Sequence, residues 1–194
     1  METVNADTQD IKRALRFLIT AIGEDPDREG LKDTPDRIIR MWKEIFRGYN
    51  PSKRPHVTTF RNSAQSEQMV FDTGEFYSMC EHHILPFFGQ YYFAYLPSPD
   101  GLLLGISKVA RVVGYCAARL QMQERLAKDV VDMLDEALEG TALGFAIVLR
   151  GQHLCKSMRG VRSHGDMGVS YYTGAFKESA ALRAEFLAMI KAEG

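Results

Sequence analysis

The stretch MVFDTGEFYSMCEHHILPFFGQYYFAYL, residues 69–96, decides the fold of this chain. Aromatic and aliphatic residues, which favour β-strands, fill residues 69–79 and 89–96 on either side of a short polar segment. We therefore predict two strands over these ranges, connected by the Cys-Glu-His-His segment at residues 80–83. An apolar run follows this segment, so we expect it to lie where a strand meets a loop, partly sheltered from water.

The sequence downstream of this pair predicts two helices and then two further strands. Apolar periodicity and capping residues give the following ranges: helices over 107–120 and 123–138, strands over 141–150 and 167–173, and a closing helix over 178–192. Two strands, two helices and two strands in this order indicate an α+β fold with an antiparallel sheet. Long aromatic strands without an evident cover on one face also predict a partner subunit.

Residues 1–50 are predicted to form a separate N-terminal helical subdomain, with residues 51–194 as the main domain. Apolar residues at helical spacing indicate a first helix that Gly23 ends: Ile11, Leu15, Leu18 and Ile22. Thr34 and Pro35 predict the start of a second helix, because threonine is a frequent N-cap and proline is tolerated in the first turn.

Cysteine and histidine side chains cluster in the segment that joins the first two strands. Together with two residues far downstream, this segment supplies two thiolates and up to three imidazoles: Cys80, His82, His83, His153 and Cys155. This ligand set selects zinc among the common biological metals. Three ligands would leave a fourth position open, as in catalytic zinc sites. The spacing of Cys80 and His83 lets both reach one ion from a turn, which leaves His82 free for proton transfer.

His153 and Cys155 are two residues apart, so both would face the same side of an extended segment. One could bind the metal while the other transfers protons. A single cysteine or histidine is more often a core residue, so the joint pattern carries the zinc prediction. Cys116 differs from the others, since it lies in an apolar stripe at helical spacing and is predicted to pack in the core.

A second group of residues suggests anion binding at the start of a predicted helix. Ser107 is placed to cap this helix, and Lys108 and Arg111 follow it. Free backbone donors and the helix dipole attract phosphate at such a position, and the two cations add to the attraction. Arg159 places more positive charge near the predicted metal ligands. Taken alone, Lys108 and Arg111 would be read as an ordinary solvated helix face.

Composition narrows the class of protein. The chain has 194 residues, a formal net charge of −1 and three cysteines. A net charge near zero gives no long-range field that would favour nucleic acid or membrane. An odd number of cysteines without disulfide spacing fits a reducing compartment, and the polar N-terminus does not read as a signal peptide. We expect a cytoplasmic enzyme that binds neither nucleic acid nor membrane.

Six segments of the chain resemble the GTP cyclohydrolase I family. In chain order they are EDPDREGL, TPDRI, FYSMCEHHILPFFG, GISKVAR, ARLQMQERL and HLCKSMRGV. The resemblance runs from about residue 11 to 190, and CEHH with the downstream H-x-C-x-x-x-R-G is highly specific to that family. It implies the tunnelling fold, in which antiparallel sheets and helix pairs from several subunits close a barrel. It also implies a homodecamer of two stacked pentamers with active sites at subunit interfaces.

The resemblance implies a zinc-dependent reaction on GTP. Cys80, His83 and Cys155 match the family's zinc (Zn2+) ligands, and His82 and His153 match its acid–base histidines. In the implied reaction water adds at C8 of guanine, the imidazole ring opens and C8 leaves as formate. Ring closure then gives 7,8-dihydroneopterin triphosphate, the first step of folate and tetrahydrobiopterin synthesis. A histidine beside a ligand suits protonation of the leaving ring nitrogen.

The resemblance also implies the contacts to the substrate. Glu124 matches the residue that holds the guanine ring, with Gln123 beside it, and Ser107 is a candidate for proton transfer at the ribose. Further residues match contacts to ribose and triphosphate: Ser107, Lys108, Arg111, Arg159 and, from a neighbouring subunit, Arg37. Lys156 departs from the family, where methionine or another apolar residue commonly follows the zinc cysteine, and we expect a local surface adjustment there.

Two other functions fit parts of the pattern. A nitrile reductase of deazaguanine metabolism on the same fold would use a nucleophilic cysteine and nicotinamide, and Cys155 and His83 argue against it. A zinc-stabilised oligomer that binds a partner protein would need a fourth protein ligand, for which Cys116 is a poor candidate. The sequence leaves open whether a regulatory protein binds.

Overall fold

The computed structural model describes residues 7–193 and divides the chain into two units after Arg47. This division lies close to the boundary predicted after residue 50. No helix in the described residues has the length and apolar character needed to cross a membrane. The two units are described separately below.

The first unit consists of two helices, α1 (Thr8–Ala21) and α2 (Thr34–Ile45). The buried apolar residues of α1 are Leu15 and Ile19, whereas Leu18 and Ile22 are 58% and 80% exposed. The predicted stripe therefore only partly matches the buried face of this helix. The N-cap of α2 is Asp33 and not Thr34 as predicted, and its side chain makes no capping hydrogen bond.

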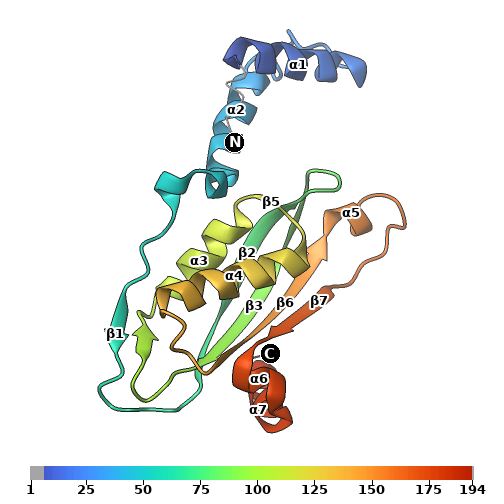
Figure 1. The fold of residues 1–194 in the computed structure, drawn as a ribbon. Helices are drawn as coiled ribbons and strands as arrows, with labels where there is room; N and C mark the ends of the chain where they lie inside the picture. Colours follow the sequence, from blue (N-terminus) through green and yellow to red (C-terminus); the bar gives the residue numbers. More distant parts are fainter. Residues whose placement is uncertain (1–6, 194) are drawn as a thin grey trace. The chain divides into compact units, whose positions relative to one another are not determined.

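The second unit is built on a sheet with the strand order β5-β2-β3-β6-β7 (Figure 1). All neighbours are antiparallel except β2 and β5, which run parallel. The bounds are β2 (Val70–Cys80), β3 (Leu85–Leu96), β5 (Leu120–Gln121), β6 (Gly144–His153) and β7 (Met167–Tyr172). This mixed, largely antiparallel arrangement agrees with the predicted α+β class.

A small second sheet pairs β1 (Thr59–Arg61) with β4 (Leu102–Leu104), again antiparallel. The sequence did not predict either strand. Three residues are too few to show the alternation of polar and apolar side chains by which a strand is recognised.

Helices α3 (Lys108–Ala117) and α4 (Gln123–Ala137) cover one face of the main sheet (Figure 1). Their apolar residues form the core with aromatic side chains of β2, β3 and β6, among them Phe76 and Phe93. Cys116 belongs to this core at 1% exposure, and burial raises the pKa of its thiol to about 12. The prediction of a core residue is thus confirmed. Ser107 is the N-cap of α3, although its side chain makes no capping hydrogen bond.

Two C-terminal helices, α6 (Gly174–Glu178) and α7 (Ala180–Ala192), cover part of the opposite face. Phe176 and Phe186 are fully buried there against Ala94 and Ala146 of the sheet. The closing helix predicted over 178–192 agrees with α7, which begins at Ala180, whereas the short helix α6 before it was not predicted. The chain divides at Ser179, whose side chain caps α7 by accepting a hydrogen bond from the backbone N–H of Leu182.

Strand register gathers distant segments at one end of the main sheet. Cys80 ends β2, pairs with Leu85 across the turn and with Gln121 of β5. His153 ends β6 opposite Phe87 of β3. Helix α4 begins just after β5, and the short helix α5 (Leu154–Ser157) follows β6 directly. Figure 1 shows α5 beside the turn between β2 and β3.

Candidate functional site

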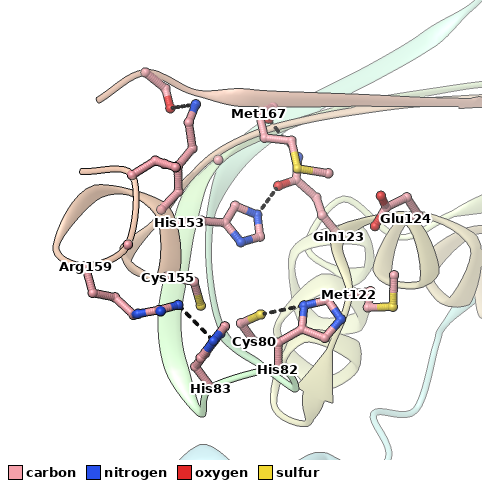
Figure 2. Close-up of a pocket in the computed structure, with 15 residues that line it drawn as sticks. Cys80, His82, His83, Met122, Gln123, Glu124, His153, Cys155, Arg159 and Met167 are labelled. Atoms are coloured by element: carbon pink, nitrogen blue, oxygen red, sulfur yellow. Dashed lines mark hydrogen bonds between the residues drawn. The ribbon is translucent and has the colours of Figure 1, made fainter. Parts of the chain in front are cut away.

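A pocket of about 490 Å³ lies at this end of the sheet (Figure 2). Its volume is within the range of small-molecule sites. It brings together three segments that are far apart in sequence, namely the β2–β3 turn, the start of α4 and the segment after β6. The sequence-predicted residues among its lining are Cys80, His82, His83, Gln123, Glu124, His153, Cys155, Lys156 and Arg159.

The two predicted zinc thiols are neighbours in this pocket. Cys80 is 4% exposed, and its thiol contacts that of Cys155. Burial, together with the hydrogen bond to Cys80, raises the pKa of Cys155. A thiol with a raised pKa stays neutral at pH 7, whereas a nearby positive charge favours the thiolate, and Arg159 acts in this direction. The Cys80 sulfur also lies 3.7 Å from Nδ1 of His82.

The backbone around Cys155 differs from the predicted extended segment. β6 ends at His153, and Cys155 lies in the single turn of α5. The expectation that both side chains share one face of a strand is therefore wrong. Both still line the pocket, because the helical turn begins immediately at the strand end.

His153 is held on two sides. Its ring stacks on Phe87, with centroids 4.5 Å apart and planes at 8°, and its Nε2 lies 2.9 Å from Oε1 of Gln123. The Gln123 amide nitrogen donates to the carbonyls of Leu149 and Met167, each at 2.9 Å. Because these carbonyls can only accept, Oε1 must face the histidine, and Nε2 of His153 must carry a proton. The neutral ring then has a free lone pair on Nδ1.

The surroundings of His153 favour its neutral form. Burial lowers the pKa of its imidazole, and the positive charge of Lys156 lowers it further, while Glu124 acts in the opposite direction. A neutral imidazole with Nδ1 free can accept a proton and return it, as an acid–base group requires.

His83 and Arg159 contact each other at the pocket rim. A guanidinium nitrogen of Arg159 lies 2.9 Å from Nε2 of His83 (Figure 2). Because arginine only donates, this ring nitrogen accepts. In residues 7–193 no group of three or more His, Cys, Asp and Glu side chains is arranged to hold a metal ion. The donor types nevertheless fit zinc, since two neighbouring thiols and an imidazole converge on the same pocket.

Charged side chains complete the lining. Glu124 lies in the first turn of α4, is exposed and lines the pocket. Lys156 donates from Nζ to the carbonyl of Gly165 at 3.4 Å. With Arg159, it gives the pocket two cations beside one carboxylate. This pairing suits a ligand with both hydrogen-bond donors and negative charge.

The predicted anion-binding residues Ser107, Lys108 and Arg111 lie elsewhere. Gly105 and Ile106, just before them, line a small cavity with Asp72 near the start of β2. Cys80 is eight residues beyond Asp72 on β2, roughly 26 Å along the strand. Within one chain, the structure therefore does not bring these three residues to the pocket.

Arg37 belongs to the first unit. It lies on α2, where its guanidinium is 3.6 Å from the carboxylate of Asp33.

Sequence reasoning missed several uncharged residues of the pocket: Met122, Gly151, Val161, Gly165 and Met167. Space is tight at Gly151, because a Cβ there would lie 3.0 Å from Oε1 of Gln123 and from the ring of Phe76, so one of these side chains would have to move. Gly151 directly follows the strand predicted over 141–150, and because β6 extends to His153 it lies inside the observed strand, where a glycine often marks a close approach.

Comparison with known proteins identifies the relatives of this chain. Residues 11–191 match the family described as GTP cyclohydrolase I. GTP cyclohydrolase 1 of Caldanaerobacter subterraneus is 44% identical over 96% of this chain and 98% of its own length. The protein of the same name from Dehalococcoides mccartyi is 42% identical over 97% and 99%. An apo archaeosine synthase QueF-Like structure, at 16% identity and a TM-score of 0.44 over 57% of this chain and 97% of that one, bears on neither fold nor function.

Proposed function

The chain belongs to the GTP cyclohydrolase I family, and from this premise we propose that it opens the guanine imidazole ring of GTP and releases formate. The product is 7,8-dihydroneopterin triphosphate. One observation supports this most strongly: the thiols of Cys80 and Cys155, the imidazole of His153 and the carboxylate of Glu124 share one pocket although they come from three distant segments.

We propose that Cys80, Cys155 and His83 hold one zinc ion per chain. Zinc, when bound, lowers the pKa of a water molecule to about 7 and so supplies hydroxide near neutral pH. The contact between the two thiols and the imidazole that lines the same pocket support this ligand set. Binding requires His83 to leave Arg159, which frees that guanidinium for an anionic substrate group.

His153 moves protons at the reacting ring in this proposal. Gln123 fixes its proton on Nε2, so Nδ1 is the atom that accepts a proton and then delivers it to the leaving ring nitrogen. Gln123 uses both amide hydrogens and its carbonyl oxygen within the protein, which favours a supporting role over direct contact with guanine. His82, exposed beside Cys80, is the second acid–base candidate.

Glu124 selects guanine. Its carboxylate can accept hydrogen bonds from N1–H and the 2-amino group, and adenine offers neither of these donors. Once a bound base covers this carboxylate, leaving it unpaired is costly, so a base without both donors is disfavoured in the transition state. Lys156 and Arg159 provide positive charge for the triphosphate from the same chain.

The remaining contacts come from other chains in this proposal. Ser107, Lys108 and Arg111 lie at the far end of α3 from the pocket, so they can serve only a site completed by a neighbour. Arg37 is assigned to the triphosphate of a neighbouring site on the resemblance alone. Both assignments agree with a homodecamer of the tunnelling fold, in which unpaired edges of β2 and β7 are covered by other subunits.

Formate release tests the proposed function. The zinc-loaded protein should release one formate per GTP consumed and yield a pterin, with little turnover of ATP. Inosine triphosphate, which lacks the 2-amino group, should react far more slowly. Cys80→Ser should lose zinc and formate release together, whereas Cys116→Ser, a substitution outside the pocket, should keep zinc. GTP consumption without formate, or full activity in Cys80→Ser, would overturn the proposal.

A further inference from the structure

Glu81, the acidic residue between the two histidines and Cys80, has no part in the chemistry above. It begins the turn between β2 and β3, and its backbone N–H donates to the carbonyl of Gln121 at 3.1 Å. Its carboxylate pairs with the guanidinium of Arg125 on α4. Glu81 is thus fastened to the neighbouring segment by both its main chain and its side chain.

Arg125 links this turn to the start of α4. It follows Gln123 and Glu124 in sequence, and its Nε donates to Oε1 of Gln121 at 2.9 Å. The guanidinium of Arg125 therefore contacts the β2–β3 turn, which carries the proposed metal ligands. Arg125 itself lies next to Glu124 in the first turn of α4. Arginine suits this position because its planar fork can serve two acceptors at once.

Gln121 anchors the link in the protein interior. It is 1% exposed, and its amide nitrogen donates to the carbonyl of Cys116 at 3.1 Å and to the carboxylate of Asp129 at 2.9 Å. These two donations leave its oxygen for Arg125. Hydrogen bonds thus connect Glu81 in the exposed turn, through Arg125, to the buried amide of Gln121 in the segment between α3 and α4.

The turn itself needs such support. Ile84, its last residue, has φ 52°, a left-handed conformation that is unfavourable for a β-branched side chain. Its N–H closes the turn by donating to the carbonyl of Cys80 at 2.9 Å. A strained turn persists only where its surroundings determine it, and Glu81 with Arg125 provides one of these constraints.

We propose that Glu81 and Arg125 are positioning residues that set the turn of Cys80, His82 and His83 relative to Glu124. This inference rests on the proposed function for its catalytic consequence. In this proposal the ion pair keeps Cys80 and His83 at a fixed distance from the carboxylate of Glu124, which binds the guanine base. Reacting groups displaced by about 1 Å can lose rate by about a hundredfold.

The ion pair between Glu81 and Arg125 contributes little to the stability of the fold. The side chains of Arg125 and Glu81 are 46% and 33% exposed, and ion pairs at such positions add little to the free energy of folding. Loss of the pair should therefore alter the site without unfolding the protein. This separates a positioning role from a structural one.

Glu81→Gln and Arg125→Lys test the inference, with Asp132→Asn as the matched control. Asp132 pairs with Lys128 on the same helix at similar exposure, away from the pocket. Co2+ bound to the two thiols and the imidazole reports their geometry through its visible absorption. Glu81→Gln and Arg125→Lys should change this spectrum and lower kcat for formate release about tenfold or more, with KM for GTP changed less. Asp132→Asn should match the parent in both.

The double variant Glu81→Gln/Arg125→Lys should be no worse than the poorer single variant, because the two residues act as a unit. Melting temperatures within about 2 °C of the parent are expected. A parent-like Co2+ spectrum and kcat in Glu81→Gln would overturn the inference, as would unfolding of both single variants. The spectrum is recorded without GTP. A parent that binds Co2+ but releases no formate when loaded with zinc would thus refute the proposed function and leave the positioning role standing.

Discussion

At the residue scale, the orientation of one amide decides which nitrogen of His153 is free. Gln123 donates to two backbone carbonyls, so its oxygen faces the histidine and fixes a proton on Nε2. Stacking on Phe87 holds the ring plane. Gln123 and Phe87 therefore determine that Nδ1 of His153 is the ring nitrogen available for proton transfer.

His153→Ala should keep most of the zinc and lose turnover by roughly a hundredfold or more, the usual scale for an acid–base group. The reason is that His153 lies beside the metal donors without being one of them in the proposed ligand set. Zinc content and the rate of formate release check this together. A demetallated variant would make His153 a ligand and require new roles for both histidine pairs.

Asp72 gives a prediction about pH. Burial raises the pKa of its carboxyl above the ordinary 3.8, although a 2.8 Å hydrogen bond from the hydroxyl of Tyr91 opposes this. The folded protein then holds a proton that the unfolded chain has lost, so stability falls as pH rises from near 3.8 through the folded pKa. Asp72→Asn keeps an acceptor for Tyr91 and has no carboxylate to desolvate.

The advantage in unfolding free energy of Asp72→Asn over the parent should therefore grow as pH increases from 4 to 7. Denaturant titrations at several pH values measure it. A deficit of equal size at every pH would show instead that the variant has lost the bond from Tyr91.

At the element scale, the site depends on close packing between β3 and β6. A Cβ on Gly89 would lie 1.9 Å from the carbonyl oxygen of Arg150, so only glycine fits at this crossing. β6 carries His153 at its end, and any displacement of this strand moves the acid–base group. Gly168 on β7, by contrast, has nothing within 4 Å of an added Cβ.

Gly89→Ala should destabilise the protein by about 3 kcal/mol or more, because a backbone atom cannot give way as a side chain does. Gly168→Ala should leave stability unchanged or raise it by up to about 1 kcal/mol, since alanine loses less conformational entropy than glycine. Chemical denaturation compares the two. Equal stability of both variants would mean that β3 and β6 can separate at little cost.

The sequence was most informative where a pattern is long and local. The aromatic strands around residues 80–83 followed from residue types that favour β-structure, and the helices α3 and α4 and the core position of Cys116 followed from apolar periodicity and capping residues. It was least informative where three residues form a strand, or where a strand turns into a helix without a glycine or proline, as at Cys155. The contact between Gln123 and His153 joins residues 30 positions apart, and no local pattern encodes it.

At the scale of the whole molecule, the residues proposed for substrate binding cannot all come from one chain. Ser107, Lys108 and Arg111 lie far from the pocket of their own chain. Large apolar side chains are also exposed to solvent in the single chain, for example Phe17 (72% exposed) and Tyr77 (68% exposed). A homodecamer with sites between subunits would account for both facts. Activity should then depend on assembly.

Mixing Arg37→Ala with His153→Ala under conditions of subunit exchange should restore formate release. Some interfaces would combine an intact arginine from one chain with an intact histidine from another, while each variant alone lacks one group at every site. Mass spectrometry of mixed oligomers verifies the exchange. Demonstrated exchange without recovery would mean that each site is built within a single chain.

The central claim is that Cys80 and His83, together with the distant Cys155, bind one zinc ion and leave its fourth coordination position open. X-ray absorption at the zinc edge of the purified protein tests it most directly. We predict two sulfur neighbours at about 2.3 Å, one imidazole nitrogen at about 2.0–2.1 Å and one further light atom from water. Four sulfur neighbours, or a first shell without sulfur, would contradict the account.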